Sequence, residues 1–149
     1  MKCSLMFSAL ALLLAVGCAP KATFEVSIAN KSDSPLTVGV VKEGEPYERD
    51  LAGPEKWAIE SPLDSLPPWG HVIPVGRVLN SPQITGSFPQ GSAAYLRVYR
   101  GERTNAQLIA ISSPSPDRLD VLLFPGVNQI VIRNDPQKGL VAVRVRPKP

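Results

Sequence analysis

The sequence predicts an all-β domain, and three observations support this prediction. Of the 149 residues 16 are proline, about twice the average frequency, so few intervals are long enough for an ordinary helix. Within the intervals, apolar and polar residues alternate with a period of two, as in strands that bury one face. Turn sequences rich in Gly, Pro, Asn, Asp and Ser separate these segments. We therefore expect a single antiparallel β-sandwich of about seven to nine short strands.

The first two strands are predicted at residues 23–30 and 36–41. Each alternates apolar side chains with polar or small ones, and the polar residues 30–35 supply a turn between them. This arrangement predicts a hairpin-like opening of the fold. The side chains expected to face the core are Phe24, Val26, Ile28, Leu36, Val38 and Val40.

The same region carries a short pattern. An Asn-x-Ser-x-x-Pro-Leu sequence begins at Asn30 and ends at Leu36, directly after the first apolar strand. It resembles the first strand pair of many bacterial immunoglobulin-like sandwiches. The resemblance implies a sandwich of immunoglobulin-like or related Greek-key type.

The middle of the chain is predicted to hold loops and edge strands. Residues 42–53 are polar and contain Gly and Pro, which is typical of a long loop or a frayed edge, and a short strand is expected at 57–60. Residues 61–69 hold three prolines and are expected to cross the surface. The apolar run 70–79 is interrupted by Pro74, so it is expected to form an edge strand or a strand with a bend.

The longest proline-free interval of the domain, residues 90–113, is the predicted place of a central hairpin. Its first strand is expected at 94–99, its turn at 100–105 and its return strand at 107–111.

Three further strands are predicted near the C-terminus, at residues 119–124, 128–133 and 140–145. Short turns rich in Pro, Gly, Asn and Asp separate them, and we expect them to complete a meander. The chain shows no internal repeat and no linker long enough to divide it. Residues 23–149 are therefore expected to form one domain.

Residues 1–18 have the three zones of a secretory signal. Lys2 is the only charge, an apolar run covers residues 5–16, and a small residue, Gly17, ends the segment. A bilayer-spanning helix needs about 20 apolar residues, so this run is too short to remain as a membrane span. Pro20 also prevents a helix from continuing.

The end of this segment resembles the bacterial lipobox, because residues 14–18 read Leu-Ala-Val-Gly-Cys. The resemblance implies cleavage before Cys18 and a diacylglycerol on its sulfur, usually with a further acyl chain on the new amine. More than one chain makes a lipid anchor stable. The resemblance thus divides the sequence into a cleaved signal at 1–17, a lipidated tether at 18–22 and the sandwich at 23–149.

A lipid on Cys18 implies a place in the cell envelope. In diderm bacteria, an Asp after the lipidated cysteine retains a lipoprotein at the inner membrane, and this chain has Ala19 at that position. The outer membrane is therefore favoured where one exists. The expected partners are the membrane, through the lipid, and an unknown envelope protein or glycan.

The charge of the domain excludes nucleic acid as a partner. Without Lys2, 15 basic residues are balanced by 13 acidic ones, and no run of Lys or Arg occurs. The only basic cluster, formed by Arg144, Arg146 and Lys148, alternates with uncharged residues as a terminal strand would.

The sequence offers few residues for catalysis or metal binding. Cys3 leaves with the signal and Cys18 is the expected lipid site, so neither a disulfide nor a cysteine-ligated metal is expected. His71 is the only histidine, and no known catalytic or phosphate-binding motif occurs. We therefore expect no enzymatic activity, no metal and no cofactor.

Four residues are candidates for ligand binding: Tyr47, Trp57, Trp69 and His71. They fall in the Pro- and Gly-rich third of the domain, and loops on a rigid scaffold are where binding residues concentrate. Planar side chains at such positions could stack on a sugar or hold a peptide. The alternative, which we favour, is that Trp57 and Trp69 close an open end of the sandwich as core residues.

Tyr95, Arg97 and Tyr99 are candidates for an interaction surface. They share the strand face opposite Leu96 and Val98, and Tyr and Arg are typical anchors of protein interfaces. The alternative is an ordinary outward face of a sheet, and we favour it because single surface aromatics are common.

The sequence therefore predicts a membrane-anchored envelope lipoprotein with a non-catalytic binding or structural β-sandwich. One alternative is a carbohydrate-binding accessory module, which requires Trp57 or Trp69 to be flat and exposed. Another is a hydrolase or other enzyme whose residues meet only in three dimensions. The location of His71 distinguishes this case, because a cleft shared with Asp or Glu would favour enzyme chemistry.

Overall fold

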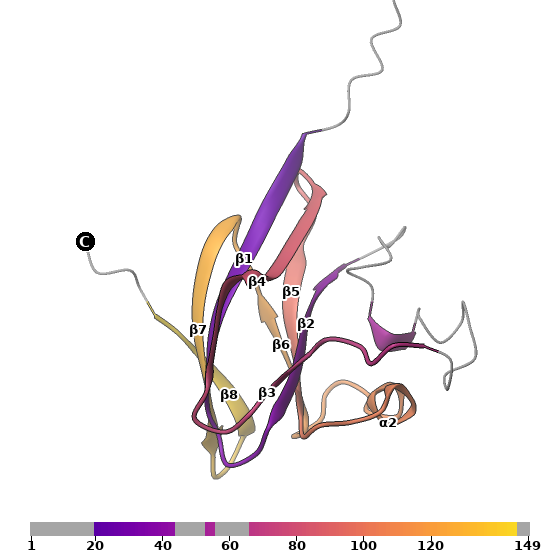
Figure 1. Cartoon of the computed structure of the whole chain (residues 1–149), viewed down its shortest axis with the longest axis vertical. Helices are drawn as coiled ribbons and strands as arrows, with labels where there is room; N and C mark the ends of the chain where they lie inside the picture. Colours follow the sequence, from indigo (N-terminus) through magenta and orange to yellow (C-terminus); the bar gives the residue numbers. More distant parts are fainter. Residues whose placement is uncertain (1–19, 44–52, 56–65, 146–149) are drawn as a thin grey trace, which may run out of the picture.

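The computed structural model describes residues 20–43, 53–55 and 66–145, and it shows two four-stranded sheets packed face to face (Figure 1). This confirms the predicted sandwich. Sheet A has the order β4-β1-β7-β8, and sheet B has the order β3-β2-β5-β6. The strands of sheet A are β4 (Val78–Pro89), β1 (Lys21–Lys31), β7 (Gly126–Asp135) and β8 (Gly139–Arg144). The strands of sheet B are β3 (His71–Ile73), β2 (Leu36–Lys42), β5 (Ala94–Arg100) and β6 (Arg118–Leu122).

The core lies between the two sheets and is built from the alternating side chains that the sequence predicts. Val26 and Ile28 of β1 are fully buried, as are Leu36 and Val38 of β2. Burial of each such side chain contributes about 1.5–3 kcal/mol. Within the described ranges, the residues of this core and the apolar residues packed against it come from 22–142.

The predicted hairpin-like opening is wrong, because β1 and β2 lie in different sheets. β1 pairs with β4 and β7, whereas β2 pairs with β3 and β5. The connection is held by the buried side chain of Asn30, whose Nδ2 donates to the carbonyl oxygens of Ser34 and Ile73, each at 2.9 Å. Alternation shows which face of a strand is buried but not which strand lies beside it. The first two strands of immunoglobulin constant domains, in contrast, are neighbours in one sheet.

Sheet A also departs from a purely antiparallel arrangement. β1 pairs in parallel with β7, with Phe24 opposite Gly126 and Lys31 opposite Arg133, and antiparallel with β4. β1 occupies an inner position of sheet A, between β4 and β7. The N-terminal strand is therefore paired along both of its edges.

The prediction of an interruption at Pro74 is confirmed. β3 ends at Ile73 as an edge strand of sheet B, and β4 begins at Val78 as an edge strand of sheet A. The long strand β4 was not predicted, because it contains Pro82. An edge strand tolerates proline, since one row of its backbone groups needs no partner in the sheet.

The predicted return strand at 107–111 is wrong, because this segment contains the helix α2 (Asn105–Ile109). The helix begins with a capping box: the Gln107 backbone N–H donates to Thr104 Oγ1 at 3.3 Å, and the Thr104 N–H donates to Gln107 Oε1 at 3.0 Å. β6 instead pairs with β5. The capping box satisfies the free backbone N–H groups at the start of the helix. The helix therefore forms here in place of the strand that the alternation of apolar and polar residues predicts.

The last three strands exist near the predicted positions but do not form one meander. β6 belongs to sheet B, while β7 and β8 form a hairpin in sheet A. The predicted strand at 57–60 and most of the predicted loop at 42–53 lie outside the described residues. Within the described ranges, no helix is both long enough and apolar enough to cross a membrane.

Candidate functional site

Trp69 lies on the outer face of sheet B, where it is 4% exposed. Its ring meets the ring of Tyr99 edge-on, with 5.8 Å between centroids, and it belongs to a second apolar cluster with Val41 and Leu108. The Trp69 backbone N–H donates to Asn105 Oδ1 at 2.9 Å, which fixes the segment against α2. Trp69 is therefore buried, as we favoured, but it covers a sheet face instead of closing an open end.

A small hollow of about 400 Å³ lies beside this cluster. Part of the Trp69 side chain reaches its wall, together with residues of the segment before β3 and residues from the start of α2. Its lining includes Thr37, Leu66, Pro68, Trp69, Gly70 and Val72. Trp69 presents too little surface there to serve as a flat platform for a sugar.

His71 is exposed at the first position of β3, opposite Val38 of β2. Among residues 20–43, 53–55 and 66–145, no group of three or more His, Cys, Asp or Glu side chains is close enough to hold a metal ion. The other two candidates for ligand binding, Tyr47 and Trp57, lie outside the described residues.

The predicted stripe of Tyr95, Arg97 and Tyr99 does lie on the outer face of sheet B, but most of it is covered. Tyr99 is 1% exposed, and burial raises the pKa of its phenol. Arg97 forms ion pairs with Glu55 at 3.1 Å and Asp120 at 3.0 Å. Burial works against the charge of Arg97, yet the hydrogen bond and charge of Asp120 outweigh it and raise the pKa of the guanidinium.

Tyr95 differs from its two neighbours on this face because its hydroxyl reaches the surface. It donates to Glu43 Oε2 at 3.1 Å, and this hydrogen bond raises the pKa of the phenol. The stripe is therefore neither an open interaction surface nor an ordinary outward face. It is a sheet face on which Trp69 and α2 pack.

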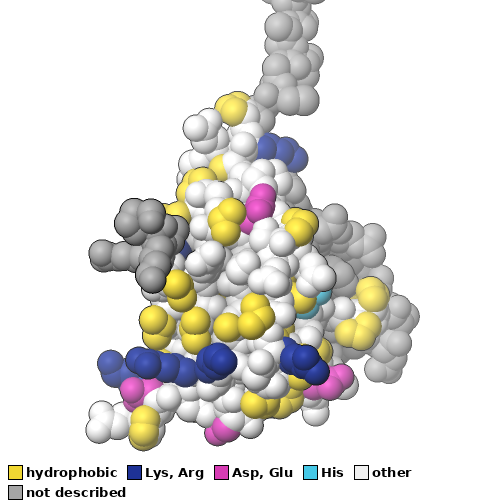
Figure 2. Space-filling view, turned by 60° about the vertical axis from the view of Figure 1, so that its left-hand side comes forward, with side chains coloured by type: hydrophobic (Ala, Val, Ile, Leu, Met, Phe, Trp, Pro, Cys, Tyr) yellow, Lys and Arg dark blue, Asp and Glu magenta, His cyan; other side chains and the backbone are white. Residues whose placement is uncertain are grey.

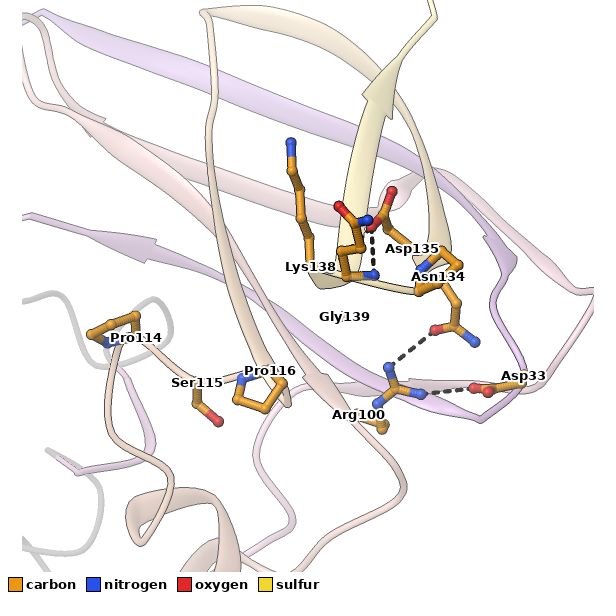
Figure 3. Close-up of a pocket in the computed structure, with 11 residues that line it drawn as sticks. Asp33, Arg100, Pro114, Ser115, Pro116, Asn134, Asp135, Lys138 and Gly139 are labelled. Atoms are coloured by element: carbon orange, nitrogen blue, oxygen red, sulfur yellow. Dashed lines mark hydrogen bonds and ion pairs between the residues drawn. The ribbon is translucent and has the colours of Figure 1, made fainter.

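An open pocket of about 750 Å³ lies at one end of the sandwich (Figure 3). Three connections enclose it: the turn after β1, the loop before β6 and the turn between β7 and β8. Its lining is polar apart from proline rings. The residues are Asp33, Arg100, Pro114, Ser115, Pro116, Asn134, Asp135, Pro136, Gln137, Lys138 and Gly139.

Arg100, the last residue of β5, joins these three connections. Its Nη1 donates to Asp33 Oδ1 at 2.7 Å, and its Nη2 donates to Asn134 Oδ1 at 3.0 Å (Figure 3). Its Nε lies 3.2 Å from Asp117 Oδ1. The guanidinium thus has an acceptor in the turn after β1, in the loop before β6 and at the end of β7, and its planar fork holds these pocket walls in a fixed arrangement.

Two carboxylates of the pocket have a pKa below the ordinary value of an aspartate. Hydrogen bonds from the side chains of Asn134 and Ser34, with help from the charge of Arg100, lower the pKa of Asp33. The backbone N–H groups of Gln137 and Lys138, each 2.9 Å from Asp135 Oδ1, lower the pKa of Asp135. Because two thirds of the Asp33 side chain remains exposed, it can also accept hydrogen bonds from a bound molecule.

Sequence reasoning did not select any residue of this pocket. Its walls come from turn sequences such as Asn134-Asp135-Pro136, which were interpreted only as connections. No local pattern could have marked them, because the site exists only once the ends of β1, β5 and β7 meet.

Comparisons with known proteins found no relative of this chain. No family model, no curated protein and no solved structure matches this chain. The geometry of the described residues therefore supplies the structural argument for function.

Proposed function

We propose that the protein is a membrane-anchored envelope lipoprotein whose β-sandwich binds a partner without catalysing a reaction. The observation that carries this proposal is the position of the lipobox cysteine. Cys18 precedes Lys21, the first residue of β1, by three positions. Three residues span at most about 10 Å, so acyl chains on Cys18 would keep the sandwich at the membrane surface. Ala19 favours the outer membrane in a diderm cell.

The pocket around Arg100 is the proposed binding site. β1 starts at Lys21 and runs along the length of the sandwich (Figure 1). Asp33, which lines the pocket, follows the last residue of β1, Lys31, by two positions. The 11 residues of β1 cover about 33 Å. The site is thus at the far end of the domain from the anchor, where a bulky partner has room.

The chemistry of the pocket favours a partner rich in hydrogen-bond donors. Asp33 and Asp135 offer carboxylate oxygens, and Asn134 and Gln137 offer amides that both donate and accept. The hydroxyl groups of a glycan or the polar side chains of an envelope protein match this set. Since Trp69 is buried, a glycan would have to use this pocket and not the indole.

The anchor is tested with Cys18→Ser in the full chain, expressed in a bacterium that processes lipoproteins. We expect the wild-type protein to partition with membranes and the variant to stay unprocessed or to become soluble, because serine has no thiol to receive the diacylglycerol. Intact-mass measurement of the wild-type protein decides the matter. A mature N-terminus other than Cys18, or a mass without acyl chains, would contradict the proposal.

The binding site is tested by blocking the pocket. Gln137→Trp places an indole at the pocket mouth, whereas Gln90→Trp places the same group at the tether end, where the Gln90 N–H donates to the Pro20 carbonyl oxygen at 2.8 Å. Both glutamines are exposed, so neither change should lower the melting temperature. We expect only Gln137→Trp to abolish capture of a partner from envelope extracts. Equal capture by both variants would show that the partner binds elsewhere.

A further inference from the structure

One row of residues across the outer face of sheet A is apolar. On β1 and β7 the core-facing residues include Ile28 and Ile130, so the adjacent Ala29 and Val131 point outward. Ala29 lies opposite Val131 on β7 and Val78 on β4, and Val131 lies opposite Val143 on β8. The result is one apolar row across all four strands: Val78, Ala29, Val131 and Val143.

The valines at the two ends of this row are exposed to solvent. Val78 is 55% exposed and Val143 is 39% exposed, and the exposed Val145 lies beside this row, whereas the Ser27 and Gln129 pair separates Val127 from it. The solvent face of an antiparallel sheet is normally polar. A contiguous apolar patch of this kind is typical of an interaction site.

A basic row lies directly beside the apolar row. Lys31 and Arg133 pair two positions further along β1 and β7, and Arg77 precedes Val78. Within the described part of the chain, none of the three forms an ion pair, and Arg133 interacts with the charge of Asp135 over a longer distance. Figure 2 shows this side of the molecule, with hydrophobic side chains gathered above a band of Lys and Arg.

We infer that this face docks on an anionic phospholipid membrane, an inference that rests on the proposed anchor. Charge complementarity favours anionic headgroups for the basic row, while the valines can enter the boundary between headgroups and acyl chains. The length of the tether agrees, because β1 belongs to sheet A and starts about 10 Å or less from Cys18. The backbone groups inside a sheet are already paired, so contact with lipid leaves none of them unsatisfied.

This orientation has a consequence for the pocket. With sheet A on the membrane, the strands lie along the bilayer, and the pocket at the end of β1 opens sideways at the membrane surface, about 33 Å from the tether. The partner would then be met at the membrane and not far above it.

The test uses vesicles and a chain without lipid. The chain from Ala19 onwards contains both described sheets with the core between them and lacks Cys18, so any binding comes from the protein surface. Its cosedimentation is measured with vesicles of phosphatidylcholine alone and of phosphatidylcholine with phosphatidylglycerol. We expect binding only to the anionic vesicles, weakened by salt.

Charge variants locate the contact. Lys31→Ala with Arg133→Ala should lower the partition coefficient about 25-fold, because each basic residue near an anionic surface changes it about fivefold. The matched control, Lys42→Ala with Lys138→Ala, removes the same charge outside the face and should leave most of the binding. An equal loss in both pairs would mean attraction by net charge alone and would overturn the inference.

Apolar variants test the depth of contact. Val143→Ser lies in the apolar row, and Ile109→Ser on α2 has nearly the same exposure, 39% against 37%. We expect only Val143→Ser to weaken vesicle binding severalfold, with both proteins melting like the parent. If the chain instead sediments as a dimer that Val143→Ser dissociates, the face binds a second copy and the inference fails. Such a failure leaves the anchor untouched, since the mass of the full-length protein decides that separately.

Discussion

Replacing Trp69 with alanine is expected to lower the free energy of unfolding by about 3–5 kcal/mol, the usual cost of removing a buried aromatic side chain. The ring is almost fully buried on the outer face of sheet B, where it packs with Tyr99 and Leu108. In a domain of this size the melting temperature should fall by more than about 10 °C, which calorimetry can measure.

The control for this prediction is Trp69→Phe. A phenyl ring keeps an aromatic contact with Tyr99 and leaves a smaller cavity, so its cost should be clearly lower. A Trp69→Ala protein that melts like the wild type and has lost an envelope partner would contradict the structural role. Trp69 would then have to be a binding residue.

The sandwich could be predicted from sequence because alternation is a local property. Val26 and Ile28, or Leu36 and Val38, show in a few residues which side of a strand is buried. The pairing of those strands depends on residues far away, such as Gly126 opposite Phe24 in the parallel pair. No local pattern distinguishes a neighbour within a sheet from a neighbour across the core, so the expected opening hairpin was wrong.

The candidate sites could not be predicted for a related reason. The pocket forms where three turns meet around Arg100, and each turn alone has an ordinary sequence. The covering of Tyr99 by Trp69 and α2 likewise joins segments about 30 residues apart. One signal was available: Thr104 and Gln107 have the spacing of a capping box, which predicts the helix that the period of two concealed.

A second informative signal is Gly39 in the middle of β2, since glycine within a strand often marks a close approach. Its φ is not positive, so conformation does not require glycine there. Space does: a Cβ at this position would lie 2.6 Å from Trp69 Cζ2 and 2.7 Å from Cη2. Gly39→Ala should therefore destabilise the protein by about 1–3 kcal/mol through overpacking, as measured by denaturant unfolding.

The double mutant shows whether this cost comes from the indole. With Trp69→Ala already present, the Cβ of Gly39→Ala enters the space that the ring has left, and alanine in place of glycine also reduces the entropy of the unfolded chain. Gly39→Ala should then be neutral or stabilise by up to about 1 kcal/mol. The cost of Gly39→Ala thus disappears or reverses in sign, which corresponds to a coupling energy of about 1–4 kcal/mol between the two positions. If Gly39→Ala costs the same in both backgrounds, the indole does not rest on β2, and the assignment of Trp69 to the covered face of sheet B is wrong.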